Sequence, residues 1–150
     1  MSVTTRRFAV ATLFTGVIAG LVGLACIHLL HWIQALAWDM HSGTLLEAVS
    51  AVSPARRVLN LVLGGIFGAA SWFFLFRRSR AITSVSAAVG GTPMPPLRAT
   101  WHALTQVLIV GLGASVGREV APREMAAAFS AAAADRLKLT PGDRRIIVAC

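Results

Sequence analysis

The most restrictive feature of the sequence is a long uncharged segment near its start. From Phe8 to Trp38 the chain contains no Asp, Glu, Lys or Arg. This segment is longer than the roughly 20 apolar residues that an α-helix needs to cross a bilayer, whereas the apolar core of a cleaved signal peptide has only about 7 to 15 residues. It therefore predicts a tilted membrane-spanning helix over residues 8–38.

Two further uncharged segments extend this pattern. Residues 58–76 lie between clusters of arginine and end in aromatic residues, and residues 99–117 carry Trp101 near one edge, where interfacial aromatic residues commonly lie. Both segments predict membrane spans. Pairs of glycines four residues apart, which let helices approach closely in lipid, occur in the first two spans: Gly16 and Gly20, and Gly64 and Gly68.

Composition and charge also favour a membrane protein. The chain is 56% hydrophobic and 13% charged, with a mean hydropathy of +0.71. Its 14 Lys or Arg residues outnumber 6 Asp or Glu residues, a balance that would also suit a nucleic-acid binder. However, the arginines cluster at the borders of the uncharged segments: Arg6 and Arg7, Arg56 and Arg57, and Arg77, Arg78 and Arg80. This distribution predicts no nucleic-acid partner, and it predicts that the N-terminus and the connection 77–98 are cytoplasmic.

A charged stretch, GREVAPRE at residues 117–124, follows the third segment. A carboxylate near the bilayer centre costs roughly 2.5 to 3.5 kcal/mol, so Glu119 needs a favourable partner there. A helix that begins near Pro122 inside the membrane would offer one, because its first amides attract anions. Glu119 would then be a tethered anion that competes with a permeating one. The alternative is a surface loop with a solvated Glu119, and composition alone leaves both interpretations open.

Shorter segments predict helices that do not cross the membrane alone. Residues 83–89 precede TPMPP, whose prolines interrupt helices, and they predict a short re-entrant helix that starts at hydroxyl residues. Residues 122–136 predict a short intramembrane helix, and residues 146–150 predict the start of a further one. Because this last apolar segment is too short to cross a membrane before the sequence ends, we expect the chain to be the N-terminal part of a longer protein.

The stretch around GREVAP resembles a known family. With the glycine-rich span before it and DRLKLTPGDRRIIVAC after its small-residue helix, it is similar to the gating-glutamate region of the CLC chloride channels and anion/proton exchangers, where the motif is usually GREGP or GKEGP. The resemblance covers most of the chain in layout and residues 117–150 at motif level. It implies that residues 1–150 form a partial CLC-like transmembrane domain. The implied fold is an all-α, polytopic membrane helical bundle with re-entrant and broken helices, incomplete here, and usually dimeric in the complete protein.

The resemblance also implies roles for individual residues. Glu119 matches the gating glutamate, which can also accept a proton, and Gly117 and Arg118 match the residues before it. The backbone amides of Val120 and Ala121 would contribute to anion binding. These two residues stand where the family has Gly-Pro, so the proline comes one position later here.

A hydroxyl group from an earlier segment would complete the implied anion site. The family's first anion-binding motif, GSGIP, corresponds in position to ITSVS in this chain. Thr83 is the preferred candidate on approximate register, with Ser84 or Ser86 as alternatives. The flanking glycines and the proline of the motif are absent.

These features predict a voltage-gated-type chloride channel or anion/proton antiporter subunit, present here as an N-terminal fragment. It would reside in the plasma (inner) membrane as a multi-pass protein with its N-terminus in the cytoplasm. Its partners would be the lipid bilayer, chloride or another small anion, protons in an exchanger, and a second copy of the complete protein. No cofactor, metal or enzymatic activity is expected. The alternative is a truncated or accessory small membrane protein without transport activity.

Three other motifs are weaker. GASVG at residues 113–117 fits the G-x-S-x-G pattern of serine hydrolases, but all four histidines precede Ser115. VLIVGLGASVG imitates a dinucleotide-binding fingerprint, but the following REVAPRE breaks the helix that this motif requires. Cys26, His28 and His31 lie close together, but no fourth metal ligand is evident, and we interpret the histidines as interfacial residues.

Overall fold

The computed structural model describes residues 3–40, 42–77 and 82–149. All regular secondary structure within these residues is α-helical, which confirms the predicted all-α class. The helices are α1 Val3–Trp38, α2 Leu45–Ala51, α3 Pro54–Arg77, α4 Val85–Val89, α5 Pro96–Gly111, α6 Val120–Arg136 and α7 Pro141–Ala149. Arg78 and Arg80 of the predicted basic connection, and Cys150 of the predicted last helix, lie outside the described residues.

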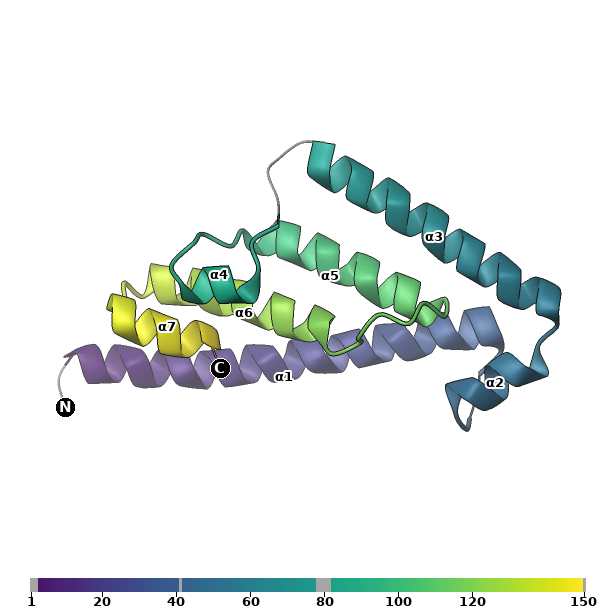
Figure 1. The fold of residues 1–150 in the computed structure, drawn as a ribbon. Helices are drawn as coiled ribbons and strands as arrows, with labels where there is room; N and C mark the ends of the chain where they lie inside the picture. Colours follow the sequence, from purple (N-terminus) through teal and green to yellow (C-terminus); the bar gives the residue numbers. More distant parts are fainter. Residues whose placement is uncertain (1–2, 41, 78–81, 150) are drawn as a thin grey trace.

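The bundle is organised around the long helix α1 (Figure 1). Helices α5 and α6 pack against each other and against α1, and α3 packs on α5. Helix α2 lies at the far end of α1, where the chain turns into α3. Helices α4 and α7 pack together and against α6 toward the N-terminal end of α1.

Two helices are long and apolar enough to cross a membrane. They are residues Thr5–Trp38 of α1 and Pro54–Arg77 of α3, and only 22% and 17% of their most apolar stretches are buried. A core helix of a soluble protein would hide most of such a stretch. Here many large apolar side chains of both helices are exposed instead, among them Leu13 on α1 and Phe74 on α3, as lipid-facing side chains are.

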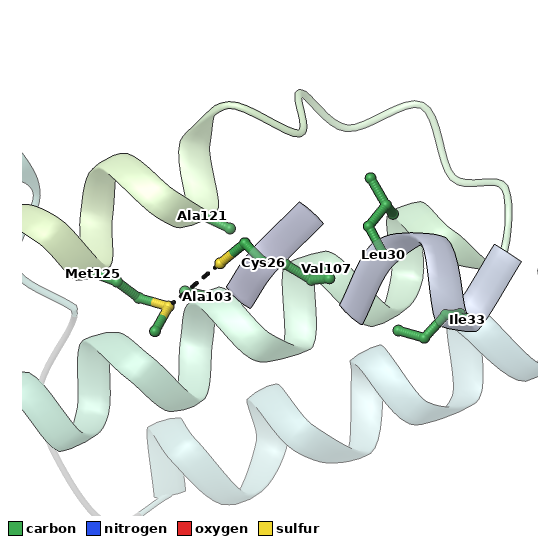
Figure 2. Close-up of a cluster of buried hydrophobic side chains, with 7 residues drawn as sticks. All are labelled: Cys26, Leu30, Ile33, Ala103, Val107, Ala121 and Met125. Carbon is green, nitrogen blue, oxygen red and sulfur yellow. Dashed lines mark hydrogen bonds between the residues drawn. The ribbon is translucent and has the colours of Figure 1, made fainter. Parts of the chain in front are cut away.

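The largest core cluster joins α1, α5 and α6 through small side chains (Figure 2). Ala103 of α5 and Ala121 of α6 are 0% and 1% exposed. The thiol sulfur of Cys26 on α1 lies 3.8 Å from the thioether sulfur of Met125 on α6. Because the alanines add so little bulk, the three helix backbones approach closely, which is how helices associate in lipid.

The glycine pairs of α1 and α3 have different surroundings. A Cβ atom at Gly64 would lie 3.3 Å from Cβ of Leu112, and one at Gly68 would lie 3.1 Å from Cγ2 of Ile109. These two glycines therefore let α3 approach the end of α5. At Gly16 and Gly20 an added Cβ would meet nothing within 4 Å among the described residues.

Hydrogen bonds with α3 and α5 fix the far end of α1. The Asn60 side chain donates to the carbonyl of Ala37 at 2.8 Å, and Arg56 donates to the same carbonyl at 2.9 Å. The indole N–H of Trp38 donates to the carbonyl of Gly111 at 2.8 Å. Because Gly111 is the last residue of α5, this bond joins the ends of two helices that are distant in sequence.

The helix boundaries differ from the predicted ones at the break before α6. Helix α5 ends at Gly111, whereas the predicted span continues to residue 117, and Gly113 then adopts a positive φ of +103°. Such a backbone suits glycine and ends the helix. Helix α6 starts at Val120, ahead of Pro122, and α7 starts at Pro141, ahead of residue 146.

Candidate functional site

The N-terminus of α6 begins partway along α1 and not at the end of the bundle (Figure 1). A cavity of about 280 Å³ beside it is lined by residues between 23 and 30 of α1, by α5 and by residues 117–119, 121 and 122. Residues 23–30 lie in the interior of the uncharged run 8–38. The charged stretch therefore lies beside the uncharged run of α1.

Glu119 occupies the N-cap position of α6. Its side chain forms no capping hydrogen bond, and the residue is exposed along the wall of this first cavity. The carboxylate folds back over Gly117, so that any side chain at position 117 would collide with it. Glycine at this position is therefore what allows Glu119 its present conformation.

The first turn of α6 has few backbone donors. The Val120 amide donates to the carbonyl of Gly117 at 3.3 Å, and Pro122 has no amide hydrogen. The amide of Ala121, a residue that is 1% exposed and lines the first cavity, belongs to the same turn. Together with the partial positive charge at a helix N-terminus, this arrangement favours an anion.

A second, larger cavity of about 590 Å³ lies across the start of α6 from the first. It is lined by residues of α4, α5 and α6 and by Ala149. Val120 and Ser84 both face it, so the start of α6 and the start of α4 meet there. The Ser84 hydroxyl accepts from the Ala87 amide at 3.2 Å and lies 3.1 Å from the hydroxyl of Ser86.

Thr83, the hydroxyl preferred from the sequence, has another position. Its hydroxyl donates to the carbonyl of Pro93 at 2.9 Å, and it lines neither cavity. This bond fastens the segment before α4 to the proline-rich segment before α5. The structure therefore brings Ser84, with Ser86, to the second cavity in place of Thr83.

The other predicted site residues divide between the two cavities. Gly117, Arg118, Glu119 and Ala121 line the first, and Val120 lines the second. Arg118 is exposed. All five residues surround the same helix start.

Sequence reasoning missed a buried polar cluster on the second cavity. Nδ1 of His102 on α5 lies 2.8 Å from a carboxylate oxygen of Glu124 on α6. The amide nitrogen of Gln106 lies 2.9 Å from the same His102 nitrogen and 3.3 Å from the same Glu124 oxygen. The i, i+4 spacing of His102 and Gln106 places them on one helix face, but no sequence signal pairs that face with Glu124.

Cys26, His28 and His31 do not form a site together. The Cys26 thiol faces Met125 in the core, whereas both histidines are exposed. Within the described part of the chain, no group of three His, Cys, Asp or Glu side chains is placed to hold a metal ion.

The fold defines an all-helical membrane protein with two helices long and apolar enough to cross a membrane. The sequence profile of the family described as voltage gated chloride channel matches residues 64–150. The chain belongs to this family of chloride channels and transporters. Searches of curated proteins and of solved structures returned no match.

Proposed function

We propose that the protein transports chloride or another small anion across the membrane, as part of a channel or an anion/proton antiporter, with Glu119 as its gate. The observation that carries this proposal is the position of Glu119. Its carboxylate lies at the start of α6, beside residues 23–30 in the apolar run of α1, and lines a cavity with them. An ionised carboxylate is costly at such a depth unless it has a functional partner.

In the proposed mechanism Glu119 is a tethered anion that occupies the place of a permeating one. When its side chain swings away or takes up a proton, an anion can approach the Ala121 amide and the positive end of α6. The Ser84 hydroxyl, across the helix start, would be a second contact for the anion. Arg118, on the first cavity, and Arg123, on the second, add positive charge at the two sides of this path.

We also propose a plasma-membrane location with a cytoplasmic N-terminus, and a homodimer as the assembly. The orientation is supported by the basic residues before the first span and after the second. Helix α3 starts at the far end of α1 and runs back in the direction of the N-terminal half of the bundle (Figure 1). The dimer follows from the resemblance to the CLC family.

Chloride efflux from liposomes tests this proposal. The protein expressed from its complete reading frame would be reconstituted as wild type, as Glu119→Gln and as the control Glu47→Gln, whose site lies on the exposed helix α2. We expect Glu119→Gln to change the efflux rate and to weaken its dependence on pH, and Glu47→Gln to leave both unchanged. Wild-type protein without efflux would instead favour a membrane protein that does not transport, and equal behaviour of both variants would refute the gate.

A further inference from the structure

The buried pair of His102 and Glu124 has no role in the proposed gate. The Glu124 side chain is 8% exposed and that of His102 is 20% exposed, so the pair is mostly withdrawn from solvent. Both residues nevertheless line the second cavity, the one that Ser84 and Val120 face. A titratable pair in this position is exposed to the electrostatic potential of any anion that enters the cavity.

The three polar side chains of this cluster are all within hydrogen-bond distance of one another. Nδ1 of His102 lies 2.8 Å from a Glu124 carboxylate oxygen, to which it donates in the tautomer with a hydrogen on Nδ1, and the Gln106 amide nitrogen, 2.9 Å from the same Nδ1, donates to the same oxygen. The amide oxygen of Gln106 is buried without a hydrogen-bond partner among the described residues. Both contacts of His102 are made by Nδ1, so Nε2 is the ring nitrogen that could take up an additional proton.

We propose that His102 and Glu124 form a proton-binding site on the wall of the second cavity, which makes anion binding there depend on pH independently of Glu119. The inference rests on the proposed anion pathway. With a neutral imidazole the pair carries one negative charge, which repels an anion in the cavity. With a protonated imidazole the pair is neutral overall, and the repulsion disappears.

The other charged groups near the pair do not reverse this effect. Arg123 lines the same cavity and adds a constant positive charge, and Arg98, on α5, donates to the carbonyl of Leu75. On α7, Arg144 pairs with Asp135 at 2.7 Å. Around the start of α4 the groups are the hydroxyls of serines. Helix α3 places the indole ring of Trp72 beside His102. Helix α1 contributes the Cys26 thiol to the neighbouring first cavity, which Glu119 also lines.

The size of the effect follows from Coulomb's law. At an effective dielectric constant of about 20, removal of one unit charge at about 8 Å from a bound anion strengthens binding by about thirtyfold. Solvent in the cavity lowers this value, so we expect a change of about tenfold. Because linkage is reciprocal, anion binding must raise proton binding by the same factor.

Chloride titration calorimetry on the complete protein tests the inference. All variants would carry Glu119→Gln, which removes the titration of the proposed gate, and would be measured at pH values on either side of the ordinary histidine pKa of about 6.5. In the protein whose only substitution is Glu119→Gln, we expect chloride to bind about tenfold more tightly at the acidic pH. Glu124→Gln removes the negative charge and should bind tightly at both pH values. His102→Asn keeps a donor for Glu124 but cannot take up the proton, and it should bind weakly at both.

The outcomes separate this inference from the proposed function. If chloride binds and both added variants keep the full pH dependence, the proton-binding pair is refuted while the anion pathway stands. If no variant binds chloride, the anion pathway itself is refuted. A second measurement does not depend on whether the added variants fold: the uptake of protons when chloride is added to weakly buffered Glu119→Gln protein. If chloride binds without proton uptake, the proton-binding role of His102 and Glu124 is also refuted.

Discussion

The turn after α5 offers a sharp test of the packing described here. Gly113 has a φ of +103°, and an added Cβ would lie 2.8 Å from Cζ2 of Trp38, whose side chain is 2% exposed. A strained backbone costs an L-residue about 1 to 3 kcal/mol, and an extra atom in a well-packed site costs about 1 to 3 kcal/mol. We therefore expect Gly113→Ala to destabilise the protein by about 4 kcal/mol.

A matched glycine separates the two contributions. Gly91 has a nearly identical φ of +105°, but an added Cβ there meets nothing within 4 Å. Gly91→Ala should therefore show only the backbone cost, about 2 kcal/mol. The difference between the two variants then measures the contact of Gly113 with Trp38.

Thermal unfolding of the complete protein in detergent, followed by helical circular dichroism, provides the comparison. One kcal/mol corresponds to a shift in Tm of about 2 to 4 °C for a chain of 150 to 250 residues. Gly113→Ala should therefore unfold several degrees below Gly91→Ala. Equal midpoints for the two variants would mean that Trp38 does not pack against this turn, and the reasoning would be wrong.

Three further predictions follow from other contacts. Gly68→Val should loosen the packing of α3 on α5 and lower the free energy of unfolding by about 1 to 3 kcal/mol, whereas Gly16→Val, with no neighbour within 4 Å, should change it little in the same unfolding assay. Asn60→Ala removes a buried donor from the last turns of α1 and should cost about 1 to 2 kcal/mol, and an unchanged midpoint would contradict that bond. The backbone amide and hydroxyl of Thr44 lower the pKa of Glu47, so the capping of α2 should be complete above the ordinary glutamate pKa of about 4.3 and lost as the pH falls through the lower folded-state value. Amide exchange in α2 should show this loss, and Thr44→Ala should move it to higher pH.

The sequence predicted the features that depend on local composition. Absence of charge over residues 8–38 and 58–76 indicated the two long helices, because only a helix can bury so many backbone groups in lipid. Local signals also predicted α4, because hydroxyl residues lie at its start and the helix-interrupting prolines of TPMPP follow it. The spacing of Gly64 and Gly68 indicated a close helix contact, which the structure shows between α3 and α5.

The sequence alone did not predict the features that depend on tertiary contacts. The bond between Trp38 and the carbonyl of Gly111 joins the ends of α1 and α5 across 73 residues of the chain. The pairing of His102 with Glu124 requires α5 and α6 to lie side by side, and neither residue carries a local signal of that arrangement. Thr83 and Ser84 are neighbours with similar chemistry, so only the path of the chain determines which hydroxyl reaches the second cavity.

Chloride binding to wild-type protein and to Glu119→Gln, compared by titration calorimetry at neutral pH, tests the central claim most directly. If the Glu119 carboxylate is a tethered anion at the start of α6, its removal frees the positive helix end, and the variant should bind chloride more tightly than the wild type. Equal affinities in the two proteins would contradict the account, because they would mean that Glu119 does not compete with chloride for this site.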